Sequence, residues 1–147
     1  MAINKEKIFS TLNELIETLQ NAENGFKTAA DNVKENDLKS LLVQYAVQRT
    51  EYINELQGLI TELGGSPAKS GDVIHKGWME LKTAAATGNA QAILKVCETG
   101  ENVAVQEFSK ALKEDLPSDI KCVVSGQFGG IKVVYDNVKR LRDFKCQ

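Results

Sequence analysis

The chain has 147 residues, of which 42% are hydrophobic and 26% charged, and its formal net charge is -2. This length suits one domain with a hydrophobic core, and the composition is that of a folded globular protein rather than a disordered one. Because there is no basic excess to attract a phosphate backbone, we do not expect the chain to bind nucleic acid.

The hydropathy pattern indicates neither a membrane segment nor an export signal. The N-terminal residues become charged at Lys5, before an apolar run could form, so no secretory leader is expected. The longest apolar runs cover only a few residues, far short of a membrane span. The cysteines Cys97, Cys122 and Cys146 lack metal-binding spacing, which fits a reducing compartment with Cys97 and Cys122 as core thiols. We therefore expect a cytoplasmic protein without membrane contact.

Apolar residues recur at alternating spacings of three and four along most of the chain, as they do in amphipathic helices. A first helix is predicted over about 4–33 and a second over about 37–63, with Asn36 and Asp37 as a cap signal and Gly64 and Pro67 as a stop. A short helix over about 72–86 follows. Two long helices over about 90–114 and 117–144 complete the chain, the last one opened by Pro117.

The lengths of the connections predict how these helices are arranged. The first two long helices are joined by a few residues and should pair antiparallel, as should the last two. About 25 residues, including the short helix, separate the second long helix from the third, which is enough chain to return along the bundle. The sequence therefore predicts a single all-α domain over residues 1–147, a ferritin-like antiparallel four-helix bundle with a short helix in the long crossover.

Polar residues interrupt the apolar stripes near the middle of all four long helices. They are Glu23 on the first, Gln48 and Arg49 on the second, Glu98 and Glu101 on the third, and Gln127 and Tyr135 on the fourth. Counting outward from the two hairpin turns places Glu23 near Gln48 and Arg49, and Glu98 near Tyr135. We predict that these side chains form one polar layer across the centre of the bundle.

Buried carboxylates need compensation, because an isolated charge in the interior costs several kcal/mol. Two interpretations of the layer stay open. In one, Glu23, Glu98 and Glu101 bind a metal ion, iron or manganese, which oxygen ligands from facing helices suit. In the other, Arg49 neutralises the carboxylates in an Arg–Glu–Gln cluster that fixes the register of the helices. We favour the cluster, because Arg49 supplies a fixed cation where a metal ion would otherwise lie.

Four stretches of the chain resemble a family of uncharacterised bacterial proteins with a ferritin-like four-helix bundle, namely residues 21–26, 45–49, 75–79 and 97–101. The resemblance covers nearly the whole chain and implies a stress-related role without an established activity. Di-iron members of the wider ferritin-like group use one Glu from each of two helices and a Glu-x-x-His pair from each of the others. Glu23 matches the first single Glu, and Glu98 or Glu101 the second. Because no Glu-x-x-His occurs in the sequence, the resemblance does not extend to a standard di-iron centre.

The predicted crossover carries the single histidine, His75, and the single tryptophan, Trp78. We expect His75 to pack or cap rather than bind a metal, and Trp78 to dock the short helix onto the bundle. Gly126, Gly129 and Gly130 indicate either close helix packing or a kink.

We therefore expect a non-catalytic protein that acts by self-association, for example as a homodimer, or by binding a protein partner. The alternative is a metal-binding protein or oxidase with a degenerate di-metal site. A third hypothesis is a carrier of an apolar ligand, which would need a cavity.

Overall fold

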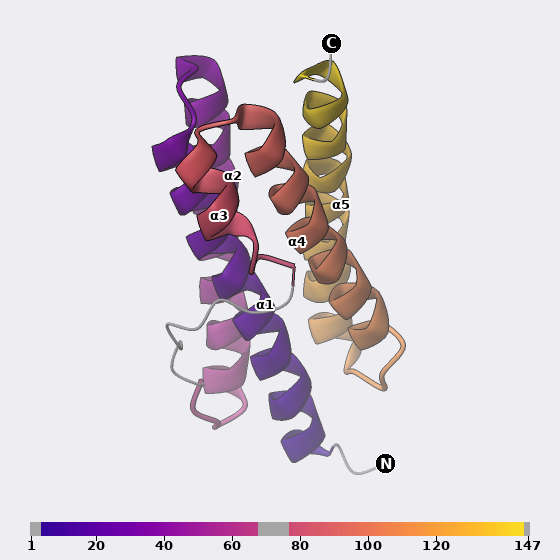
Figure 1. The fold of residues 1–147 in the computed structure, drawn as a ribbon. Coiled ribbons are helices and arrows are strands. Elements are labelled where there is room, and N and C mark those ends of the chain that lie inside the picture. Colours follow the sequence, from indigo (N-terminus) through magenta and orange to yellow (C-terminus); the bar gives the residue numbers. More distant parts are fainter. Residues whose placement is uncertain (1–3, 68–76, 146–147) are drawn as a thin grey trace.

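A computed structural model describes residues 4–67 and 77–145 of the chain (Figure 1). Its helices are α1 (Lys5–Asn32), α2 (Asn36–Glu62), α3 (Leu81–Thr87), α4 (Ala90–Ala111) and α5 (Ser118–Lys145). Because no strand occurs in these two ranges, the prediction of an all-α fold is confirmed.

Capping residues explain several of the helix ends. The Asn4 side chain accepts a hydrogen bond from the Lys7 amide (3.2 Å) at the start of α1, and Asn89 caps α4 in the same way. Gly88 ends α3 in the left-handed region (φ 65°), which favours glycine. The predicted cap of the second helix is wrong, because Asn36 is already helical and Glu35 precedes it without a side-chain cap bond.

The short helix differs most from its prediction. It begins at Leu81 and not near residue 72, because residues 77–80 form turns. Gly77 has φ 85°, which a helix does not admit, and its backbone passes directly over α4. The part of the prediction that covers residues 72–76, including His75, lies outside the described residues.

The four long helices pack side by side (Figure 1). α1 pairs antiparallel with α2, and α4 with α5, while α1 also contacts α4 and α2 contacts α5. As a result, α2 and α4 run in the same direction, and α3 lies against α1 and α4. Across both described ranges, no helix combines the length and the apolar character needed to cross a membrane.

The apolar core is divided into two clusters along the helices. One cluster contains Phe26, Leu42 and Trp78, and the other contains Leu56 and Phe108. The buried polar side chains of the described residues are Arg49, Glu101 and Gln127. Arg49 and Glu101 lie between the two clusters along the chain numbering, whereas Gln127 lies between Val124 and Ile131 of the second cluster.

Candidate functional site

The centre of the molecule holds an ion pair between Arg49 of α2 and Glu101 of α4. The guanidinium donates through Nη1 to Glu101 Oε1 (2.5 Å) and through Nη2 to Oε2 (2.6 Å), and neither residue is exposed to solvent. Two parallel charge-assisted bonds of this kind fix the orientation of both groups. Both carboxylate oxygens are therefore occupied by a cation that is part of the protein.

Two further side chains complete the surroundings of Arg49. Its Nε donates to Oε1 of the half-buried Gln48 (3.1 Å). Its guanidinium lies over the ring of Phe26 on α1, 5.5 Å from the ring centroid, which is within the range of a cation–π interaction. Arg49 thus joins three helices, α1, α2 and α4, at one height.

Gln127 is buried on α5 but contacts α2 one turn beyond Arg49. Its amide nitrogen donates to the Tyr52 carbonyl oxygen and to the Glu55 carboxylate, both at 3.2 Å, while its Oε1 has no hydrogen-bond partner. α5 can approach α2 here because residue 130 is glycine: a Cβ at Gly130 would overlap the Tyr52 hydroxyl. The contacts of Gln127 therefore lie one turn away from the Arg49–Glu101 pair.

The other polar residues of the predicted layer have separate partners. Glu23 accepts a hydrogen bond from the Thr50 hydroxyl and lies 3.6 Å from Lys27 Nζ, so it faces the neighbourhood of Arg49 without joining the pair. Glu98 lies 2.8 Å from Arg142 Nη1 on α5. Arg142 lies about two turns further along α5 than Tyr135, the residue expected near Glu98. Tyr135 is half-buried.

The structure does not bring Glu23, Glu98 and Glu101 together. Each carboxylate has its own cation or hydroxyl donor on a different neighbour. Over residues 4–67 and 77–145, no group of three or more His, Cys, Asp or Glu side chains is placed to hold a metal ion. Counting along the sequence did not predict these separate partners, because they depend on how the helices are rotated and staggered.

Trp78 fills the interface between α1 and α4 and is 1% exposed. Its indole lies between Gly25 of α1 and Gly100 of α4, and a Cβ at either glycine would overlap the ring. It also packs edge-to-face on Phe26, with ring centroids 5.3 Å apart. Phe26 therefore packs on Trp78 and also contacts the guanidinium of Arg49. Sequence analysis missed the two glycines, although a glycine inside a helical stripe is itself a signal of close approach.

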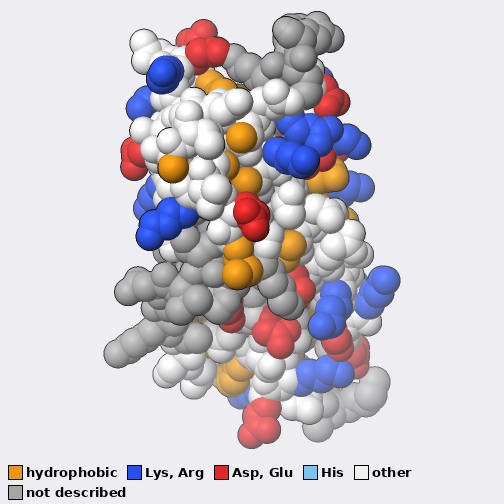
Figure 2. Space-filling view, in the orientation of Figure 1, with side chains coloured by type: hydrophobic (Ala, Val, Ile, Leu, Met, Phe, Trp, Pro, Cys, Tyr) orange, Lys and Arg blue, Asp and Glu red, His pale blue; other side chains and the backbone are white. Residues whose placement is uncertain are grey.

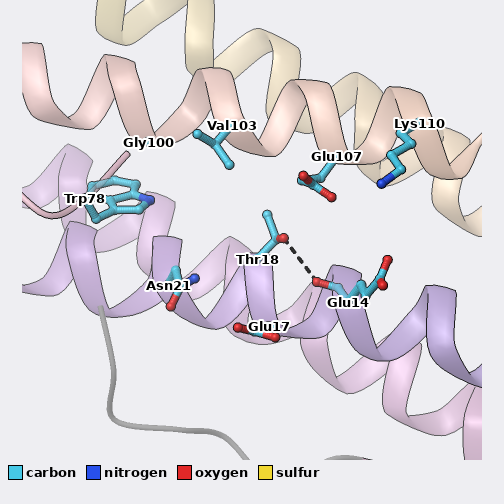
Figure 3. A pocket seen from close by; sticks show the side chains of 9 residues that line it. All are labelled: Glu14, Glu17, Thr18, Asn21, Trp78, Gly100, Val103, Glu107 and Lys110. Atoms are coloured by element: carbon cyan, nitrogen blue, oxygen red, sulfur yellow. Dashed lines mark hydrogen bonds between the residues drawn. The ribbon is translucent and has the colours of Figure 1, made fainter. Parts of the chain in front are cut away.

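An acidic groove runs between α1 and α4 beside Trp78 (Figure 3). It encloses about 260 Å³, and its lining residues are Glu14, Glu17, Thr18 and Asn21 of α1, Gly100, Val103, Glu107 and Lys110 of α4, and Trp78. The Thr18 hydroxyl donates to the Glu14 carbonyl (3.1 Å), which ties it to its own helix. Among the described residues that line the groove, there are three carboxylates and one ammonium. Elsewhere on this face, acidic and basic side chains are interspersed (Figure 2).

Comparison with known proteins gives a family without an assigned activity. The model described as Domain of unknown function (DUF2383) matches residues 7–114, a range that contains Arg49, Trp78 and Glu101 and ends before α5. None of the curated proteins matches the chain. Since the match covers well over half of the sequence, the chain belongs to the DUF2383 family.

Proposed function

We propose that the protein is a non-catalytic, ferritin-like helical bundle that acts by binding another protein. The ion pair of Arg49 and Glu101 carries this proposal. Di-iron members of the ferritin-like group place metal-binding glutamates at the bundle centre. In this chain, a guanidinium occupies both oxygens of the central glutamate, so the buried charges serve the packing of the helices. The parallel course of α2 and α4 supports the ferritin-like arrangement.

The acidic groove between α1 and α4 is the surface on which this binding takes place. Glu14 and Glu107 offer negative charge to a partner segment that carries Lys or Arg, and Val103 offers apolar surface to the aliphatic part of such a side chain. The groove lies on two long helices held apart by Trp78, so its shape is set before a partner arrives.

Affinity capture with groove variants tests the proposal. Wild-type protein and the Glu14→Gln/Glu107→Gln variant serve as bait in a cell extract, and captured proteins are identified by mass spectrometry. The matched control is Glu51→Gln/Glu62→Gln, which removes the same charge from exposed positions of α2. A specific partner should bind wild type and control, be lost with the groove variant, and weaken as salt is raised. Capture that is indifferent to the groove substitutions would contradict the proposal.

The rival hypothesis of a carboxylate metal site is tested on the same preparations. Elemental analysis of freshly purified protein measures iron and manganese per chain. About one equivalent of either metal that disappears in both Glu23→Ala and Glu98→Ala would replace the proposal by a metal-binding function.

A further inference from the structure

A second groove lies between α2 and α5, a different pair of helices from those that form the acidic groove. It encloses about 290 Å³, and its lining residues are Leu41, Tyr45, Asn137, Arg140 and Leu141. This volume is just below the roughly 300–1,000 Å³ typical of small-molecule sites. The two leucines provide apolar walls, while the other three side chains can donate hydrogen bonds.

The Tyr45 hydroxyl is the unusual group of this groove. Its oxygen is buried, and its contact with the Asn137 side chain falls short of good hydrogen-bond geometry. Burial raises the pKa of Tyr45, so the phenol stays protonated and can donate. The ring is held in place by edge-to-face packing on Phe26, with centroids 5.4 Å apart. Buried polar groups in proteins are nearly always paired, so a poorly paired and fixed donor points to a ligand.

Arg140 supplies a positive charge at the same groove. Its side chain is exposed, and no described carboxylate forms an ion pair with it, whereas its neighbour Arg142 pairs with Glu98. The groove therefore combines one cation, one buried hydroxyl donor and two leucine walls, which together match a small carboxylate with an apolar body.

We propose that the groove between α2 and α5 binds a small monocarboxylic acid with a short apolar chain. The ligand's carboxylate lies against Arg140 and accepts a hydrogen bond from the Tyr45 hydroxyl, and its chain packs on Leu41 and Leu141. Because the hydroxyl oxygen is covered from solvent, the half-buried Asn137 side chain turns aside as the ligand enters. This site is separate from the acidic groove, so it does not depend on the proposed protein binding.

Octanoate is the probe, and its binding to the full chain is followed by nuclear magnetic resonance of backbone amides. Saturable shifts are expected at Leu41, Tyr45, Asn137 and Leu141, with none around the acidic groove. Octanol, which keeps the chain but lacks the charge, should bind more weakly. Shifts spread over exposed apolar positions such as Val43 and Val47, or equal binding of octanol, would overturn the proposal.

Two variants with matched controls separate the roles of the polar groups. Tyr45→Phe should weaken octanoate binding about tenfold or more, since it removes a hydrogen bond to a charged group, while it keeps the ring against Phe26. Arg140→Gln should weaken binding about two- to fivefold, because the side chain is exposed. Tyr135→Phe and Lys139→Gln, which change the same groups outside the groove, should bind like wild type.

The remaining outcomes also decide the question. Equal losses in variants and controls would overturn the assignment of the ligand to Tyr45 and Arg140. Shifts of the same amides with protein concentration alone would assign the groove to a second copy of the chain and overturn the small-molecule proposal. Thermal unfolding of each variant shows that it is folded, and the Arg140 substitution tests the site at an exposed position where folding does not depend on the side chain.

Discussion

At the scale of single residues, the fully buried pair of Arg49 and Glu101 is the most demanding feature of the chain. Taking two charges out of water is costly, and their attraction offsets this cost only with good geometry and satisfied remaining donors. The geometry of the pair is good, because it is bidentate, and each guanidinium nitrogen makes a hydrogen bond, with Nε donating to Gln48. The guanidinium also lies over the ring of Phe26. Two experiments therefore measure how the pair contributes to stability. One removes a single partner, and the other replaces both partners by apolar residues.

Arg49→Met should lower the free energy of unfolding by about 3–5 kcal/mol, because it leaves the Glu101 carboxylate buried without a cation. Urea denaturation monitored by circular dichroism measures the change. The double variant Arg49→Met/Glu101→Leu should recover most of the loss, since no charge is then left unpaired. If the single variant were as stable as wild type, Arg49 would not be needed to compensate the buried charge of Glu101.

Cys97 should make stability depend on pH in the alkaline range. It is buried on α4, and burial raises the pKa of its thiol above the unfolded value of about 8.5, with Glu101 adding to the effect. Since the folded chain binds the thiol proton more tightly, this contribution is fully present below about pH 8.5 and falls by about 1.4 kcal/mol per pH unit above it. Comparing wild type with Cys97→Ala between pH 7 and 10 isolates it, because other titrating groups are common to both.

A thiol reagent provides the control for this prediction. The exposed Cys122 should react in the folded protein, and Cys97 only as the chain unfolds. Rapid labelling of Cys97 in the folded protein would show that its thiol is accessible to solvent, and would contradict the prediction. The expectation that Cys122 is a core thiol is wrong, because α5 turns that position to solvent. The apolar pattern is weak at the start of this helix, where Asp119 and Lys121 flank the position. The sequence therefore did not predict whether Cys122 faces the core or the solvent.

At the scale of the elements, the packing of Trp78 depends on two glycines. Gly25 and Gly100 leave the space that the indole fills, and Gly77 brings the connecting chain close to α4, since a Cβ there would lie 2.8 Å from Gly100 Cα. The segment before α3 can therefore pack closely against α1 and α4 because glycines at the contact points leave room for it. The glycines of α5 are different: only Gly130 marks a close approach, and the helix continues through Gly126 and Gly129 without a break.

Gly100→Ala should lower the free energy of unfolding by about 1–3 kcal/mol, because its Cβ would displace the Trp78 indole. The matched substitution Gly126→Ala meets no atom within 4 Å and should raise stability by about 0.5–1 kcal/mol through helix propensity alone. Thermal unfolding of both variants, with Trp78 fluorescence as a probe of its surroundings, measures the contrast. Equal effects in the two variants would refute the packing argument.

Much of the fold could be predicted at this scale, because apolar stripes and capping residues depend only on local sequence. The bounds of α1 and α5 follow their stripes within a few residues. The start of α3 could not be predicted in this way. It is set by the positive φ of Gly77 and by the contact of that segment with α4, which are tertiary facts. The same holds for Glu98, whose partner Arg142 depends on the stagger of α4 against α5.

In the molecule as a whole, the buried pair of Arg49 and Glu101 lies between two parts of the apolar core. The two grooves lie on different pairs of helices. Along α2 and α4, the two apolar clusters lie on either side of Arg49 and Glu101 in the chain numbering. The acidic groove uses α1 and α4, and the Tyr45 groove uses α2 and α5. Neither groove could be foreseen from the sequence, because each depends on the spacing between helices that are distant in the chain.

The acidic groove should reduce the stability of the unbound molecule, because like charges in one groove repel one another. Glu14→Gln/Glu107→Gln should therefore raise the free energy of unfolding by up to about 1 kcal/mol, while Lys110→Gln, which removes the one cation among the described lining residues, should lower it. Urea denaturation at about 0.01 M and 1 M salt measures both variants, since screening shortens from roughly 30 Å to 3 Å between these conditions. Both effects should shrink at high salt. A double variant less stable than wild type at low salt would mean that these carboxylates stabilise the fold, and would remove the reason for treating the groove as a binding surface.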